Sequence, residues 1–95
     1  MIDYNTYTET YEACKQAEAD QRKMMRDIAL ATINCYIEAT NHFTTDKQYI
    51  KTAHATARGQ IILTKVLDLI TDEEKEILLQ QSDNAYDKAI KNFNT

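Results

Sequence analysis

The sequence predicts an all-α fold: an antiparallel three-helix bundle with a long first helix, formed by a single domain over residues 1–95. Three observations support this prediction. The chain contains no proline and one glycine, so little interrupts a long helix and turn residues for a sheet are scarce. Three helix-start signals, each a threonine followed three residues later by glutamate or glutamine, divide the chain into three segments. Within each segment the apolar residues recur at helical spacing.

The first predicted helix runs from about Thr8 to Thr40, after a capping box formed by Thr6 and Glu9. Asn41 is the best candidate for a left-handed residue that ends it. A helix of this length would be about 50 Å long, whereas a compact domain of this size is about 30 Å across. The first helix is therefore expected to overhang the bundle, to kink or to bind a partner.

Both sides of this helix are apolar, and we expect them to have different roles. Leu30, Ile33 and Ile37 form the smaller group, which we assign to the interface of a homo-oligomer. The alternative is that the third helix and the loop 41–45, with Phe43, cover these three residues. The opposite side is predicted to face the core and carries Cys14, Ala17, Gln21, Met24, Met25, Ile28, Ala31, Thr32, Cys35 and Ala39.

The second predicted helix runs from about Asp46 to Leu69, with Thr45 and Gln48 as its capping box. Its C-terminal half is apolar nearly all round, which is a second reason to expect self-association. The predicted core stripe is Tyr49, Ile50, Ala53, Ala57, Ile61, Thr64 and Leu67, and the further apolar residues are Ile62, Leu63, Val66, Leu69 and Ile70.

The third predicted helix runs from about Asp72 to Phe93 and starts at a capping box of Thr71 and Glu74. Asp72, Glu73 and Glu74 place negative charge at the positive end of its dipole. Neither glycine nor proline separates this helix from the second one, so the boundary rests on the Thr71 cap alone. The predicted core stripe is Leu78, Leu79, Ala85, Tyr86, Ala89 and Phe93.

Charge and hydropathy exclude several classes of partner. The net charge of −4 argues against generic binding to nucleic acid or to an anionic membrane. The longest uncharged runs, such as residues 28–37, are much shorter than the roughly 20 residues that span a bilayer. No charged and then apolar signal segment opens the sequence. A cytoplasmic protein is therefore expected.

The two cysteines, Cys14 and Cys35, fall on the same predicted helix. Their separation along it is about 30 Å, far beyond disulfide reach within one chain. We predict that both are small buried residues in a reducing compartment. A symmetric disulfide between two chains is the alternative.

No cofactor, metal or catalytic site is predicted, and the chain is not expected to be an enzyme. Glu38 and His42 have the spacing that presents two ligands on one helical face, and Asp46 and His54 could join them, but such a pair often arises by chance. No histidine has an evident orienting acid, and no cysteine lies beside a positive helix terminus. The only glycine, Gly59, falls inside a predicted helix, which excludes a phosphate-binding glycine loop.

Basic side chains form a stripe on the second predicted helix of this acidic protein. One interpretation is a binding site for the phosphates of a nucleotide or of RNA, with Arg58 as a bidentate contact. The alternative, which we favour, is that the stripe pairs with acids of the third helix. A second basic group, Arg22, Lys23 and Arg26, alternates with acids and is predicted to be a solvated surface. The stripe comprises Lys47, Lys51, His54, Arg58 and Lys65, and the facing acids are Asp72, Glu76, Asp83 and Asp87.

These features predict a non-enzymatic interaction protein, a self-associating helical bundle that binds and regulates or inhibits a macromolecular partner. Small acidic inhibitors, immunity proteins and phage-encoded regulators offer an analogy for such a role. The alternative function is an oligomer that binds a phosphorylated small ligand, such as a nucleotide, through the basic stripe.

Overall fold

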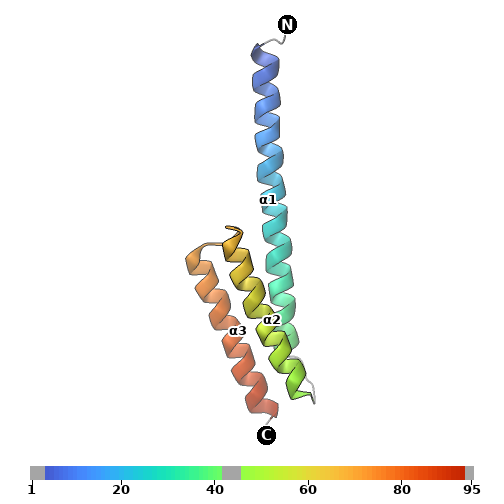
Figure 1. Cartoon of the computed structure of the whole chain (residues 1–95), viewed down its shortest axis with the longest axis vertical. Coiled ribbons are helices and arrows are strands. Elements are labelled where there is room, and N and C mark those ends of the chain that lie inside the picture. The colour runs from blue at the N-terminus through green and yellow to red at the C-terminus, as the bar shows by residue number, and fades with distance from the viewer. Residues whose placement is uncertain (1–3, 42–45, 94–95) are drawn as a thin grey trace.

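The computed structural model describes residues 4–41 and 46–93, and within these ranges the chain folds as three α-helices. They are α1 (Tyr4–Asn41), α2 (Lys47–Val66) and α3 (Asp72–Phe93) (Figure 1). The predicted all-α, three-helix arrangement is confirmed. Helix α1 begins at Tyr4, so the predicted start after a Thr6 cap is wrong, and α2 ends three residues before the predicted Leu69.

Helix α1 is much longer than the rest of the bundle. Figure 1 shows α2 running back beside the C-terminal half of α1 and α3 reversing direction again beside α2, while the N-terminal half of α1 extends beyond both. The molecule is correspondingly elongated, with principal extents of 74 × 22 × 13 Å. Of the three outcomes expected for a long first helix, the single chain adopts the overhang.

The core lies where the C-terminal half of α1 meets α2 and α3. Ile33, which is 0% exposed, packs there with Ile61, Ile70 and Leu78, and the partly buried Leu30, Ile37 and Leu79 lie against this cluster. The assignment of Leu30, Ile33 and Ile37 to an exposed oligomer interface is therefore wrong. These three residues form the side of α1 that faces the core of its own chain.

The opposite side of α1, which was predicted to be the core face, lies on the surface. Met24 is 57% exposed and Ile28 is 59% exposed, and Cys14 and Cys35 are also exposed and unbridged. The prediction that the cysteines are buried is therefore wrong as well. The physical reason is volume: Ile33 and its neighbours fill a core between three helices, whereas cysteine and alanine would leave cavities there.

The core faces of the other two helices agree better with the prediction. Tyr49 and Leu67, which were predicted to face the core, are about half exposed, so their assignment is wrong. The side chain of Phe93 on α3 lies outside the described residues. Leu79 and Tyr86 are partly buried. The predicted positions that are buried are Ile50, Ala53, Ala57, Ile61 and Thr64 on α2, and Leu78, Ala85 and Ala89 on α3.

The starts of α2 and α3 are fixed by side chains that accept backbone hydrogen bonds. The Asp46 carboxylate accepts from the Gln48 N–H at 2.9 Å, so Asp46 caps α2, whereas the predicted cap, Thr45, lies outside the described residues. At α3 the predicted capping box is confirmed. The Thr71 hydroxyl accepts from the Glu74 N–H at 3.1 Å, and the Glu74 carboxylate accepts from the Thr71 N–H at 2.9 Å.

The end of α2 is a turn with a left-handed residue, which was not predicted from the sequence. Asp68 has φ of 59°, and its N–H donates to the Lys65 carbonyl at 2.9 Å while the Leu69 N–H donates to the Thr64 carbonyl at 3.1 Å. This pair of bonds is the Schellman motif, in which glycine is the usual left-handed residue. Aspartate also tolerates this conformation. The turn buries Leu69 and aims α3 back along α2.

No helix within the described residues has both the length and the apolar character needed to cross a membrane.

Candidate functional site

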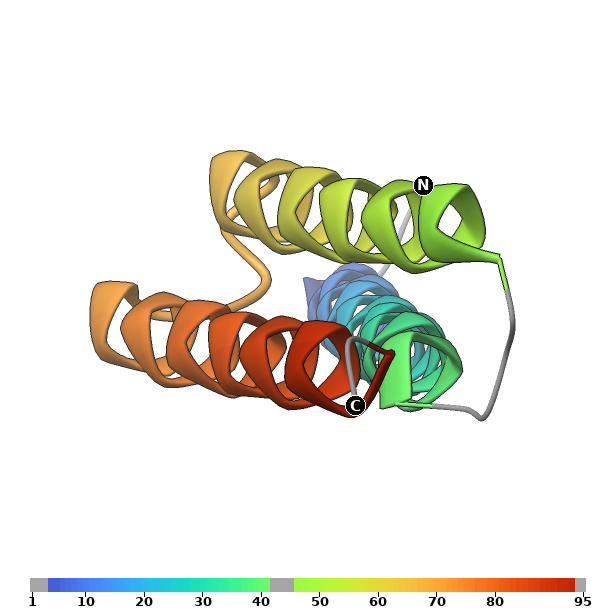
Figure 2. The ribbon, with the colours of Figure 1, turned by 90° about the horizontal axis from the view of Figure 1, so that it is seen from below.

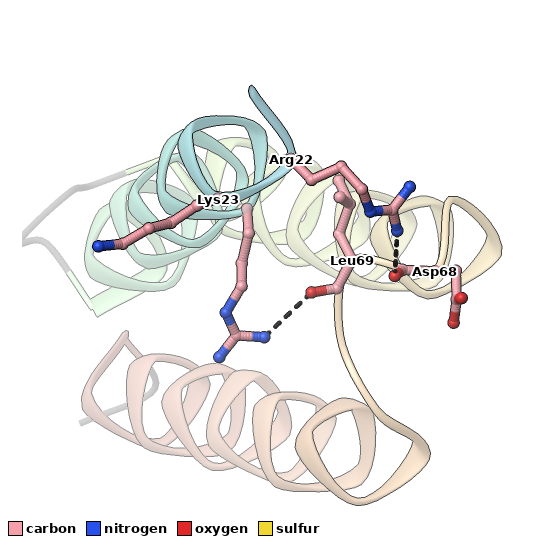
Figure 3. A pocket seen from close by; sticks show the side chains of 5 residues that line it. Arg22, Lys23, Asp68 and Leu69 are labelled. Carbon is pink, nitrogen blue, oxygen red and sulfur yellow. Dashed lines mark hydrogen bonds between the residues drawn. The ribbon is translucent and has the colours of Figure 1, made fainter. Parts of the chain in front are cut away.

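Two arginines of α1 hold the turn between α2 and α3. Arg26 donates from Nη1 and Nη2 to the Glu74 carboxylate at 3.0 and 2.5 Å, and from Nη1 to the Leu69 carbonyl at 3.0 Å. Arg22 donates to the Asp68 carbonyl at 2.9 Å (Figure 3). The prediction that these arginines belong to a merely solvated surface is wrong for both. They fix α1 against the left-handed turn at the base of the overhang.

The Arg26 guanidinium also changes the acidity of its partner. Its hydrogen bonds to Glu74, followed by the Thr71 N–H, lower the pKa of Glu74 from 4.5 to about 2. The same hydrogen bond raises the pKa of Arg26. Both groups are therefore charged at neutral pH, and the contact between α1 and α3 is a bidentate ion pair.

This ion pair predicts a specific pH dependence of stability. A carboxylate whose pKa is lower in the folded state stabilises the fold above about pH 5, and this contribution is lost as the pH falls towards about 2. Glu74→Gln should therefore lower the melting temperature at neutral pH and flatten its fall between about pH 5 and about pH 2. Thermal denaturation followed by circular dichroism across this range measures the effect. Glu73→Gln, an exposed neighbour in the same turn, is the control, and equal pH slopes for the two variants would contradict the prediction.

The same corner contains a shallow pocket of about 180 Å³, lined by Arg22, Lys23, Arg26, Asp68 and Leu69. Figure 3 shows Arg22 directed at the Asp68 carbonyl, with Lys23 pointing away from the turn. Ligand pockets in proteins are typically about 300–1,000 Å³, and both arginines here already bond to the chain itself. This corner is therefore a structural joint between α1 and the turn that connects α2 to α3.

The basic stripe of α2 is largely engaged by α3. His54 Nε2 lies 2.9 Å and Arg58 Nη1 2.7 Å from the same Asp83 oxygen, and Lys65 Nζ lies 3.5 Å from the Asp72 carboxylate. The Tyr86 ring stacks on His54 with 4.3 Å between centroids. The hydrogen bonds of His54 and then Arg58 lower the pKa of Asp83. The predicted pairing with acids of the third helix is thus found for Asp72 and Asp83.

The two remaining members of the stripe, Lys47 and Lys51, are exposed on the first turns of α2. They lie on the same helix as Arg58 and Lys65, which pair with Asp83 and Asp72 of α3. One of the possible metal ligands considered from the sequence, His42, lies outside the described residues. Among the described residues, no group of three or more His, Cys, Asp or Glu side chains is placed to hold a metal ion.

A long stretch of α1 extends beyond α2 and α3 (Figure 1). Every residue from Glu9 to Met25 is exposed, over more than four turns of helix, and within this stretch Arg22 reaches the Asp68 carbonyl of the turn. Lys15 Nζ lies 4.9 Å from the centre of the Tyr11 ring on this projecting segment. We call residues 9–25 the projecting segment.

Comparison with family models, with curated proteins and with solved structures finds no match for this chain. Its function must therefore be inferred from the geometry described above.

Proposed function

We propose that this chain is a non-enzymatic interaction protein: an antiparallel three-helix bundle that self-associates, acts in the cytoplasm, and binds and regulates or inhibits a macromolecular partner. The observation that carries the proposal is the projecting segment of α1, in which every residue is exposed in the single chain. Exposed helices of this kind are a common means of recognition between proteins.

The energetics of the projecting segment support this proposal. Most helical stability in proteins comes from packing one face of the helix against other elements. Residues 9–25 are all exposed in the single chain, although the helix continues into a well-packed bundle. A binding partner would supply the missing packing.

The joint at Arg22 and Arg26 supports a role in presenting this helix. Because both arginines bond to the turn or to α3, the direction of the overhang is fixed relative to the bundle. A segment held in its binding conformation loses less entropy when it binds, which increases affinity. The bundle would therefore act as a rigid support for the recognition helix.

The side of the overhang that continues the core-facing side of α1 is the surface that we assign to the macromolecular partner. It combines the aromatic ring of Tyr11 with the charges of Lys15 and Glu18 around Ala19, and all four residues are exposed. Tyrosine is enriched in protein interfaces, and polar side chains are typical of their rim. The net charge of −4 makes a protein a better candidate than nucleic acid.

The alternative, a phosphorylated small ligand bound by the basic stripe, has less support. His54 and Arg58 share Asp83, and Lys65 faces Asp72, so a phosphate would have to replace existing contacts. Only the exposed Lys47 and Lys51 are placed to bind an anion without such competition.

Site-specific photo-crosslinking in cells of the natural source tests the proposal. A photoreactive residue at Ala19 of the full chain should give an adduct with a defined partner, whereas the same residue at the exposed Lys88 of α3 should not. With the partner purified, Ala19→Glu should weaken binding at least about tenfold and Lys88→Glu should leave it unchanged. Identical adducts from both positions, or no adduct with another protein, would refute the assignment.

A further inference from the structure

The exposed side of α1 opposite the core carries a regular repeat. The spacing between its successive members alternates between three and four residues, and each member is exposed in the single chain. The repeat begins in the projecting segment and continues along the part of α1 that packs on α2 and α3. We call this surface the α1 seam, and it comprises Cys14, Ala17, Gln21, Met24, Ile28, Ala31 and Cys35.

The period of the seam points to a coiled coil. Alternation of three and four gives a mean of 3.5 residues per turn, whereas a straight α-helix has about 3.6. A strict 3.5-residue repeat stays on one line only when two helices wind around each other. The face that packs on α2 and α3, around Ile33, is a different one. The seam is thus suited to a partner helix outside this chain.

We propose that the α1 seam pairs with the α1 seam of a second copy of this chain, as a parallel, in-register, two-stranded coiled coil. This inference specifies the self-association part of the proposed function and rests on it. Figure 2, which looks along the long axis, shows α2 and α3 approaching α1 from one side only. Two copies can therefore pair through their seams, with α2 and α3 of each copy on the outside of the pair.

The charges beside the seam favour a second copy in the parallel orientation. On one flank lie Asp20 and Asp27, and in a parallel pair they would face the other flank of the partner, at Met25 and Thr32. In an antiparallel pair each flank faces itself. Asp20 and Asp27 of one copy would then meet the same acids of the other, which disfavours that orientation.

Gln21, the polar member of the seam, favours the same alignment. A polar residue at a core position of a coiled coil sets the register, because it is best satisfied opposite its own copy. Only the parallel, in-register pair places Gln21 against Gln21 of the second copy. Shifted or antiparallel pairs would bury its amide against an apolar side chain such as Met24, leaving hydrogen bonds unmade.

Sedimentation velocity of the full chain tests the interface. The wild type should sediment as a dimer at micromolar concentration, and Ile28→Glu should raise the dimer dissociation constant at least about hundredfold, because two carboxylates would be buried side by side. The control is Ile77→Glu, the same substitution at an exposed isoleucine of α3, which should leave the dimer intact. A monomeric wild type, or equal dissociation by both variants, would overturn the proposal.

The cysteines test the orientation independently. In the parallel, in-register pair each cysteine faces its own copy within the range of disulfide geometry. Cys35→Ser, which leaves Cys14, and Cys14→Ser, which leaves Cys35, should each form a covalent dimer with diamide, which accepts two electrons and two protons per thiol pair. The yield should be at least about tenfold above that in denaturant, where the thiols meet at random. A dimer in sedimentation that gives no covalent dimer from either variant would overturn the parallel alignment.

The tests of this inference and of the proposed function can fail separately. Ala19 lies on the side of α1 away from the seam, so its adducts report the macromolecular partner. A dimer that gives no partner adduct from Ala19 would refute only the assignment of this surface to the macromolecular partner. A monomeric wild type that still gives the Ala19 adduct would refute the coiled coil alone.

Discussion

Ile33→Ala is expected to lower the free energy of unfolding by about 2–5 kcal/mol. Ile33 is 0% exposed and lies in the cluster that joins all three helices, with Ile61 of α2, Ile70 of the turn after α2 and Leu78 of α3. Truncation removes buried methyl groups and leaves a cavity that the surrounding helices can fill only in part. A chain of this size has a total stability of about 5–14 kcal/mol, so the loss is a large fraction of it.

Urea denaturation followed by circular dichroism measures this loss, and Ile77→Ala on the exposed surface of α3 is the matched control. Ile77 is 53% exposed, so its truncation should cost at most about 0.5 kcal/mol. For the same reason Ile33→Glu should abolish the fold instead of dissociating an oligomer of intact bundles. Equal effects of the two alanine substitutions would show that Ile33 is not in the core.

Ser82→Ala is expected to raise the free energy of unfolding by about 1–3 kcal/mol. Ser82 is 1% exposed in the middle of α3, and its hydroxyl has no hydrogen-bond partner among the described residues. A buried hydroxyl that makes no hydrogen bond keeps the full cost of its desolvation. Alanine removes that cost and is also the better helix former.

Thr64→Ala provides the contrast for Ser82, because Thr64 is equally a buried hydroxyl residue inside a helix. Its hydroxyl donates to the Gln60 carbonyl at 2.6 Å, so this substitution should lower stability while Ser82→Ala raises it. Thermal denaturation of the two variants side by side measures the difference in sign. A loss of stability in Ser82→Ala would mean that its hydroxyl is hydrogen-bonded in solution.

A local signal predicted the start of the third helix correctly, whereas the similar signal at Thr6 did not mark the start of the first. The capping box of Thr71 and Glu74 depends on four consecutive residues, and the structure contains both of its hydrogen bonds. The left-handed turn at Asp68 was missed because glycine, its usual marker, is absent. Its conformation depends on the burial of Leu69 and on the hydrogen bond from Arg22, neither of which is visible in the local sequence.

The contacts between helices were predicted in part. Complementary charge on two helices indicated that the basic stripe would face the acids of α3, and Arg58 and Asp83 do meet at 2.7 Å. The joint made by Arg22 and Arg26 was missed. These arginines are separated from their partners by more than forty residues, and the neighbouring acids on their own helix gave them an adequate local explanation.

The sequence by itself determined three helices, their approximate bounds and the existence of two apolar faces on the first. Periodicity gives the direction of each face about the helix axis, but it does not say which face the rest of the chain covers. The tertiary structure decided this, because the core between three helices needs the volume of Leu30, Ile33 and Ile37. On the opposite side at the same level of the helix, Ala31 and Cys35 are too small to fill that space and remain exposed.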